Sequence, residues 1–278
     1  MNFKGVTGDE RFGMGDKLIS HAEAIGLELN IFGKKLEFNI NIRRGEMKLS
    51  DIVPVARVLC SEITDLSLEN NIKNIPCRKG CSACCSRYIV PVSVPEAFRL
   101  QEEISVLPEN QRESIWSNCL EAARLILKQE PPKSFTQLSE EIYRPDPTDL
   151  NLLSDWYSNL NISCPFLRDD LCTIYEQRPL ACREHYITGS AKACRGGHAA
   201  AEVVDISIQM PTVLGRLAGE IEGKGMEAIM LPLSLIWCEE NKRRAERTWP
   251  ADVLVGRFIE IVQETAAEHE MVFAGQSC

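Results

Sequence analysis

Apolar and polar residues alternate in two short runs near the start of the chain. Residues 27–31 and residues 36–42 each place an apolar side chain at every second position, and Gly33-Lys34 lies between the two runs. This pattern predicts a β-hairpin with one apolar face. A two-stranded ribbon alone is marginally stable, so we expect the hairpin to pack on a helix or on another strand.

Most of the remaining chain follows the 3.6-residue period of amphipathic helices. Ser50 is the predicted N-cap of the first helix, and Ser93 and Glu96 have the spacing of a capping box at the start of the second. Residues 129–146 contain several prolines and indicate a linker. The pattern predicts helices over residues 51–70, 94–106, 111–128, 147–159, 212–222, 232–247 and 250–269.

The composition is that of a globular protein, because 44% of the residues are apolar and 26% are charged. The net charge of −9 argues against a nucleic-acid partner, since no basic excess is available to neutralise phosphates. The longest apolar stretch, residues 228–237, contains Pro232 and has about half the length of a membrane span. We therefore expect a cytoplasmic protein that binds neither membrane nor nucleic acid.

The content of cysteine is unusual, with 12 in 278 residues. A chain of this length can bury a core without disulfides, and the cytoplasm keeps thiols reduced. The first set has the spacing C-x3-C-x2-C-C and consists of Cys77, Cys81, Cys84 and Cys85. Several thiolates must converge within about 2.3 Å of a metal, and the small residues of this loop allow that. Metal ligation is the favoured interpretation, and a redox pair between Cys77 and Cys84 is the alternative.

The second set has the spacing C-x7-C-x9-C and consists of Cys164, Cys172 and Cys182. Asp169-Asp170 predicts a turn, so that Cys164 and Cys172 could face each other across a hairpin. Pro179 is expected to open a short helical turn that carries Cys182. Cys194, in a glycine-rich loop, is an eighth candidate ligand, and we expect the two sets to converge in space.

The two sets together resemble the YkgJ-type cysteine-cluster family, a zinc- or iron-chelating domain. The resemblance rests on the first set followed by Cys-Pro-Phe-Leu from Cys164, Cys-x-Ile-Tyr from Cys172, Arg178-Pro and Cys182-Arg, and it covers about residues 75–195. It implies metal chelation. The flagellin lysine N-methylase family shares the adjacent cysteines with a different spacing, so that methyl transfer is an alternative.

Seven or eight cysteines exceed one tetrahedral zinc site, which needs four. We expect an iron–sulfur cluster, in the [4Fe–4S] form, with Zn²⁺ or metal-free thiol redox chemistry as alternatives. Tyr175, Arg178 and Arg183 are candidates to contact the bound cofactor. A radical-SAM enzyme is disfavoured, because Ala83 occupies a position that is usually aromatic in that superfamily and the chain lacks alternating strands and helices.

These observations predict a mainly α fold with small β-hairpins (α+β), in which an irregular cysteine-rich metal-binding core packs between helices. The expected regions are an N-terminal hairpin region (1–50), a cysteine-cluster domain (51–200) with a helical insertion at about 93–160, and a C-terminal helical region (201–278). Three functional classes remain open. They are a metal- or cluster-binding module, a cluster-dependent group-transfer enzyme, and a structural zinc protein that presents helices to a protein partner.

Overall fold

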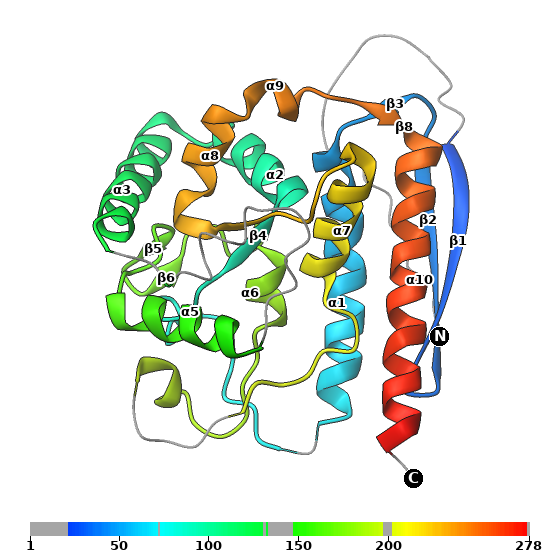
Figure 1. Cartoon of the computed structure of the whole chain (residues 1–278), viewed down its shortest axis with the longest axis horizontal. Coiled ribbons are helices and arrows are strands. Elements are labelled where there is room, and N and C mark those ends of the chain that lie inside the picture. Colours follow the sequence, from blue (N-terminus) through cyan, green and yellow to red (C-terminus); the bar gives the residue numbers. More distant parts are fainter. Residues whose placement is uncertain (1–21, 72, 130–131, 133–146, 197–201, 277–278) are drawn as a thin grey trace.

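The computed structural model describes residues 22–71, 73–129, 132, 147–196 and 202–276 (Figure 1). Helices dominate this part of the chain, and the strands occur in short antiparallel pairs, β1–β2, β3–β8, β4–β7 and β5–β6. The predicted class, mainly α with small hairpins, is therefore confirmed. Most of the predicted linker at residues 129–146 lies outside the described residues.

The helices and strands have the following bounds. The α-helices are α1 (Val53–Glu69), α2 (Val94–Ser105), α3 (Glu109–Leu127), α5 (Pro147–Leu160), α6 (Leu180–Glu184), α7 (Met210–Glu222), α8 (Ser234–Glu240), α9 (Lys242–Ala245) and α10 (Ala251–Gln276). Short 3₁₀ turns are η1 (Leu49–Ile52), η2 (Ala193–Arg195) and η3 (Leu231–Leu233). The strands are β1 (Ala22–Ile31), β2 (Lys34–Arg43), β3 (Glu46–Met47), β4 (Pro91–Ser93), β5 (Leu167–Arg168), β6 (Leu171–Cys172), β7 (Ala228–Met230) and β8 (Trp249–Pro250).

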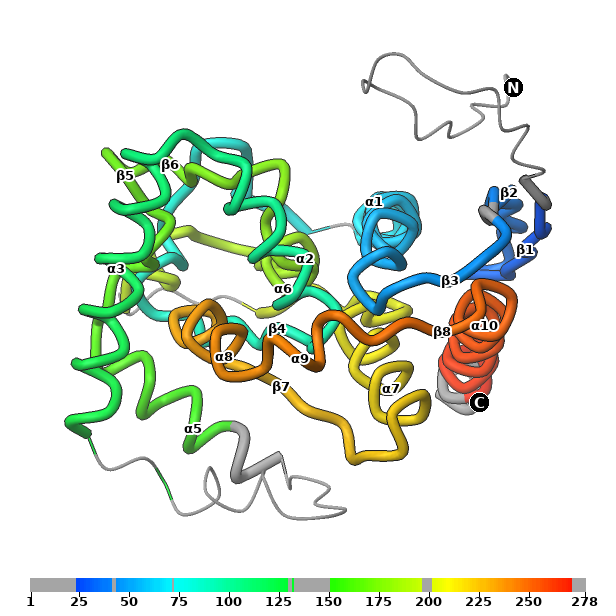
Figure 2. The backbone as a smooth tube through the Cα atoms, turned by 90° about the horizontal axis from the view of Figure 1, so that it is seen from above, coloured from blue at the N-terminus to red at the C-terminus, as the bar shows by residue number. Residues whose placement is uncertain are grey.

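The N-terminal hairpin forms as predicted and packs on a helix. β1 pairs with β2, and both strands contact α10 along its length (Figures 1 and 2). The turn is Phe32-Gly33, one residue earlier than predicted, with φ of 52° and 72°. A phenylalanine rarely adopts positive φ, but here its ring packs edge-on against His269 of α10, with 5.6 Å between the ring centroids. Aromatic packing therefore offsets the backbone cost of this turn.

The capping box predicted at the start of α2 is present, because Glu96 accepts hydrogen bonds from the Ser93 N–H (3.2 Å) and hydroxyl (2.7 Å). The N-cap predicted at Ser50 is wrong. Residues 49–52 form the turn η1, and α1 begins only at Val53. The Ser50 hydroxyl instead donates to Glu102 of α2 at 2.8 Å, so that a tertiary contact replaces the local one.

The C-terminal third departs from its predicted boundaries. The helix predicted over residues 232–247 is divided into η3, α8 and α9, because the backbone leaves the helical region at Asn241 (φ −109°, ψ 21°). The Asn241 side chain donates to the Trp237 carbonyl at 2.8 Å and closes α8. α7 ends at Gly223 with φ of 64°, as predicted. α10 continues seven residues beyond the predicted end, to Gln276.

One continuous core joins residues from the hairpin, α1, α2, α7 and α10. A smaller cluster lies at the opposite end of the molecule, where α3 and α5 pack together (Figure 2). Its residues are Ala122, Ile126, Tyr157, Ile162 and Met230. Between these two ends run the two connections that carry the cysteine sets, from α1 to β4 and from α5 to η2. In the part of the chain that the structure describes, no helix has the length and hydropathy of a membrane span.

Candidate metal centre

The first cysteine set lies on the connection between α1 and β4, which consists of consecutive tight turns. Cys81 donates its backbone N–H to the Arg78 carbonyl, and Cys85 donates to Ser82, both at 3.0 Å. Gly80 has φ of 86°, a conformation that favours glycine. These turns keep the four cysteines on one short stretch of backbone without placing them in a regular helix or strand.

The second set begins on the hairpin β5–β6. Asp169 and Asp170 form its two-residue turn with φ of 49° and 59°, which confirms the turn predicted there. The predicted pairing of Cys164 with Cys172 is wrong, because the register places Leu167 opposite Cys172. Cys164 lies before β5 in a turn of its own, where its carbonyl accepts the Leu167 N–H at 2.9 Å.

Cys182 lies on α6, the short helix that follows Pro179, as predicted. Two buried carboxylates fix this helix at its ends. Glu96 of α2 accepts the Leu180 N–H at 2.7 Å, and Glu184 accepts the N–H of Met210, the first residue of α7, at 2.8 Å. The orientation of Cys182 therefore depends on α2 and α7 as well as on its own turn.

The two cysteine sets lie side by side despite the intervening helices. The Cys164 N–H donates to the Cys85 carbonyl at 2.7 Å, which joins the backbones of the two sets directly. The Cys84 thiol interacts electrostatically with thiols of both sets and is hydrogen-bonded to Cys85. Cys84 is thus the common neighbour of the two sets.

The thiols around Cys84 form two groups. The outer group is Cys77, Cys81 and Cys194, which interact with one another and with Cys84. The inner group is Cys164, Cys172 and Cys182, which likewise interact with one another and with Cys84. Cys81 is exposed, whereas Cys164 and Cys172 pack against the main core.

The position of Cys194 differs from what its place in the sequence suggests. It lies on η2 and joins the first cysteine set rather than the nearer second set. The connection is made by the segment before η2, where the Ile187 N–H donates to the Cys77 thiol. His185, near Cys182 in the sequence, stacks on the Tyr88 ring with 3.8 Å between centroids, and His198 lies outside the described residues.

Burial determines the protonation of these thiols. It raises the pKa of Cys164 to about 12 and that of Cys194 to about 11, and it also raises the pKa of Cys182 well above that of a free thiol. The hydrogen bond with Cys85, followed by burial, raises the pKa of Cys84. All 11 cysteines in the described part of the chain are free thiols. Without metal the thiols whose pKa is raised are therefore neutral at pH 7, and a metal would have to displace their protons.

Arg178 is a charged side chain beside the inner group of thiols. Its positive charge lowers the pKa of Cys84, Cys172 and Cys182. The pKa of each thiol is nevertheless raised overall, because burial and the neighbouring thiols have the larger effect. Its guanidinium stacks on the Tyr175 ring, 4.3 Å from the centroid, and contacts the Tyr186 hydroxyl. Two of the three residues predicted to contact the cofactor, Tyr175 and Arg178, therefore lie together beside the inner group.

Arg183, the third of these residues, acts on the loop rather than on the thiols. Its Nε donates to the Arg178 carbonyl at 3.2 Å, and its Nη2 donates to the Glu176 carbonyl. Arg57 of α1 donates to the Gln177 carbonyl at 2.9 Å. Three consecutive carbonyls of the loop before α6 are thus held by arginines. The sequence carried no signal for Arg57, because its contact depends on the packing of α1 beside this loop.

The side chains are of the kind that binds zinc or iron–sulfur clusters, but they are not yet arranged as a set of metal ligands. Thiolates are the ligands that zinc and iron–sulfur clusters prefer. Arg178 Nε is buried and has no hydrogen-bond partner among the described residues, so an anionic centre beside it would compensate this group. Over the described ranges, no three Cys, His, Asp or Glu side chains already surround a single point as metal ligands do. Loading would therefore require the thiols to reorient.

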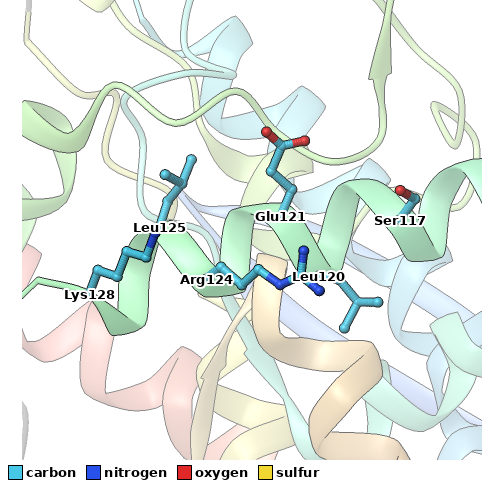
Figure 3. Close-up of a pocket in the computed structure, with 6 residues that line it drawn as sticks. All are labelled: Ser117, Leu120, Glu121, Arg124, Leu125 and Lys128. Atoms are coloured by element: carbon cyan, nitrogen blue, oxygen red, sulfur yellow. The ribbon is translucent and has the colours of Figure 1, made fainter.

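The other described cysteines lie in the hydrophobic interior. Cys60, Cys119 and Cys238 are fully buried, and Cys278 lies outside the described residues. A hollow on the outer side of α3 is lined by none of the cysteines (Figure 3). Its lining residues are Ser117, Leu120, Glu121, Arg124, Leu125 and Lys128.

Residues 76–197 match the model of a protein family named CxxCxxCC and described as a putative zinc- or iron-chelating domain. The matched segment contains both cysteine sets, Cys194 and Arg178. This chain has three residues between its first two cysteines, one more than the family name spells out. No curated protein and no solved structure matches the chain.

Proposed function

Since residues 76–197 match the model of a zinc- or iron-chelating cysteine-cluster family, we propose that this segment holds an iron–sulfur cluster of the [4Fe–4S] type. Such a cluster is held by four cysteine thiolates. The candidate ligands are Cys77, Cys81, Cys84, Cys85, Cys164, Cys172, Cys182 and Cys194. When bound, the cluster would supply one-electron chemistry.

The position of Cys84 carries this proposal. It is the thiol that neighbours both the outer and the inner group, so any single centre assembled from both sets includes it. The backbone carbonyl of Cys84 accepts hydrogen bonds from the N–H groups of Arg87 (3.0 Å) and Tyr88 (2.9 Å). This anchored backbone would hold Cys84 in place while the other thiols reorient.

The surroundings support a centre with net negative charge. Thiolate ligation of a cubane cluster leaves excess negative charge, which a neighbouring cation and hydrogen bonds to sulfur stabilise. Arg178 is held beside the inner thiols by Tyr175 and Tyr186 and has a buried N–H available. Arg183 fixes the backbone carbonyl of Arg178 and so restricts where this cation can move.

Two zinc ions are the second candidate, and the division into outer and inner groups favours them. Each group has three thiols, and Cys84, which neighbours both groups, is hydrogen-bonded to the adjacent Cys85. One further thiol for each group would complete two sets of four, the number that a structural zinc site requires. This arrangement would use all eight candidate cysteines.

Elemental analysis of the full-length protein, purified without oxygen, distinguishes the two candidates. About four iron atoms and four sulfides for each chain, with broad brown absorbance, would support the cluster. Colourless protein with about two zinc ions would support the second candidate. Protein that binds neither metal after reconstitution under reducing conditions would contradict both.

Cysteine variants test the role of Cys84. We expect Cys84→Ser to lose nearly all of the metal, because both groups adjoin this thiol. Cys238→Ala is the matched control, since it removes a cysteine that lies in the core away from either group. Cys84→Ser protein that keeps its full metal content while remaining folded would overturn the proposed centre.

A further inference from the structure

Basic residues gather around the outer thiol group, although the chain as a whole is acidic. The sequence has 40 acidic and 31 basic residues. Residues 71–95 nevertheless contain four basic residues and no acidic one, and residues 185–196 contain two basic residues and no acidic one. The six basic residues are Lys73, Arg78, Lys79, Arg87, Lys192 and Arg195. These two segments carry Cys77, Cys81 and Cys194.

The two segments lie against each other. The Gly189 N–H donates to the Asn74 carbonyl at 3.0 Å, and the Ile187 N–H donates to the Cys77 thiol. The Arg87 guanidinium lies so close to Gly196 that a Cβ atom at that position would come within 2.9 Å of Cζ. The basic residues therefore belong to one surface, which also carries the outer thiols.

Three of these cations are without any side-chain partner among the described residues. Arg78, Lys192 and Arg195 are exposed, and their side chains form no hydrogen bond or ion pair with other described residues. We call these three residues the basic rim. The remaining cations are engaged, since Lys79 pairs with Glu176 at 3.0 Å and Lys73 pairs with Glu202. Arg87 donates to the Ser158 carbonyl at 3.3 Å.

Acidic groups do adjoin this surface, but they lie on neighbouring elements. Glu176 and Glu202 are neutralised by Lys79 and Lys73. Asp170, on the turn of the β5–β6 hairpin, accepts a long hydrogen bond of 3.4 Å from the Ser82 hydroxyl. The net charge close to the outer thiols is therefore set mainly by the basic rim.

We propose that the basic rim is a docking surface for an acidic patch on a partner protein, which it brings against the outer thiol group. Exposed ion pairs contribute little individually, so three scattered cations would hold a small anion weakly. An extended acidic surface can contact all three cations at once and is steered to them over a longer range. The net charge of −9 disfavours the alternative of a long nucleic acid, which the rest of the surface would repel. This proposal does not depend on which metal the centre holds.

A fluorescent peptide of about ten glutamates is a defined probe of this surface, because it presents extended negative charge as an acidic patch does. We expect the full chain to bind it at low salt, and the affinity to fall steeply as salt is added. The triple variant Arg78→Glu, Lys192→Glu, Arg195→Glu should weaken binding by at least about tenfold, which corresponds to about 1.4 kcal/mol. Fluorescence anisotropy measures both effects.

A matched control uses Arg112→Glu and Arg124→Glu on α3 and Lys128→Glu directly after it, and Arg124 and Lys128 appear in Figure 3. All three residues are exposed, so this variant changes the net charge by the same amount. Measured at about 0.1 M salt, where charges more than about 10 Å apart are largely screened, it should alter peptide binding by less than about twofold. Equal losses in the two triple variants would overturn the proposal.

Three further results would also contradict it. In the first, the parent chain does not bind the peptide at low salt. In the second, millimolar inorganic phosphate displaces the peptide. In the third, a single-stranded DNA of similar length binds more tightly than the peptide. The metal content of the rim variant should stay that of the parent. This measurement separates failure of the docking proposal from failure of the proposed metal centre, and circular dichroism confirms that the variant is folded.

Discussion

The carboxylate of Glu96 accepts a hydrogen bond from the backbone N–H of Leu180, with 2.7 Å between Oε1 and the amide nitrogen. Its other oxygen accepts from the N–H and the hydroxyl of Ser93. A single buried carboxylate therefore completes the capping box of α2 and also holds the first residue of α6. Because α6 carries Cys182, the start of the helical insertion is directly connected to the second cysteine set.

Removing this carboxylate should loosen α6. In Glu96→Ala, the buried N–H groups of Leu180 and Ser93 lose their acceptor, which should cost about 1–3 kcal/mol of unfolding free energy. We also expect a lower metal content, because Cys182 would no longer be held in position. Urea unfolding and metal analysis measure the two effects. Glu113→Ala, at an exposed position of α3, should change neither, and an unchanged stability of Glu96→Ala would contradict the assigned role.

Burial of Glu96 should also make the free energy of unfolding depend on pH. Burial raises the pKa of the Glu96 carboxyl, and this outweighs the opposing hydrogen bonds from Leu180 and Ser93. A pKa that is higher in the folded than in the unfolded state contributes stability that is fully present below the unfolded pKa. That contribution is lost as the pH rises through the folded pKa.

We therefore expect the stability of the parent relative to Glu96→Gln to fall as the pH rises from about 4, the ordinary range of a glutamate. The difference should become constant above the folded pKa of Glu96. Denaturant unfolding of both proteins at a series of pH values gives this difference directly. Glu113→Gln, measured against the parent, should give a flat profile, and a difference that grows with pH would show that the assigned direction is wrong.

The elements that the sequence predicts well are those whose cause is local. Asp169-Asp170 forms a two-residue turn because short polar side chains tolerate positive φ, and Ser93 and Glu96 form a capping box within one helical turn. The alternation of residues 27–31 and 36–42 likewise specifies the apolar face of the first hairpin. Each of these signals lies within about ten residues of its structural consequence.

The details that the sequence missed depend on contacts between distant segments. The strand register places Leu167 opposite Cys172, although the spacing suggested Cys164, because Cys164 is held by the Cys85 carbonyl. Cys194 joins the outer group because the segment before it packs beside Cys77. The capping box predicted that Glu96 would bond to Ser93. No local pattern predicted that the other oxygen of Glu96 would accept the Leu180 N–H.

Arg178 provides a test of the charge at the proposed centre. Arg178→Met should weaken metal binding by about tenfold or more, as is usual for groups that support metal ligands, because negative charge on the thiolates would lose this neighbouring cation. Arg178→Lys keeps the charge but loses the planar guanidinium that stacks on Tyr175, so we expect an intermediate effect. Competition with a chelator measures the affinity.

Arg168→Met is the control for this series, since Arg168 is an exposed arginine on the neighbouring hairpin. It should bind metal as the parent does. If Arg178→Met retained the affinity of the parent, the thiolate charge would have to be balanced by another group, and the assignment of Arg178 would be wrong.

Arg244 and Glu222 form a buried ion pair that joins α9 to the end of α7, far in sequence from the cysteine domain. The Glu222 side chain is 0% exposed and that of Arg244 is 10% exposed. Arg244 Nε lies 3.0 and 2.9 Å from the two Glu222 oxygens, and its Nη1 lies 2.6 Å from Glu227. Arg247 also reaches Glu222, at 3.3 Å, but is about half exposed.

Arg244→Met should lower the unfolding free energy by about 3 kcal/mol, because it leaves the Glu222 carboxylate buried without its main partner. We expect the low end of the range for broken buried pairs, since Arg247 can compensate in part. Arg244→Met combined with Glu222→Gln should lose less than the sum of the single variants, because the second change removes the unpaired charge. Arg243→Met, an exposed neighbour on α9, should stay within about 0.5 kcal/mol of the parent. Additive losses in the double variant would show that the two residues stabilise the fold independently.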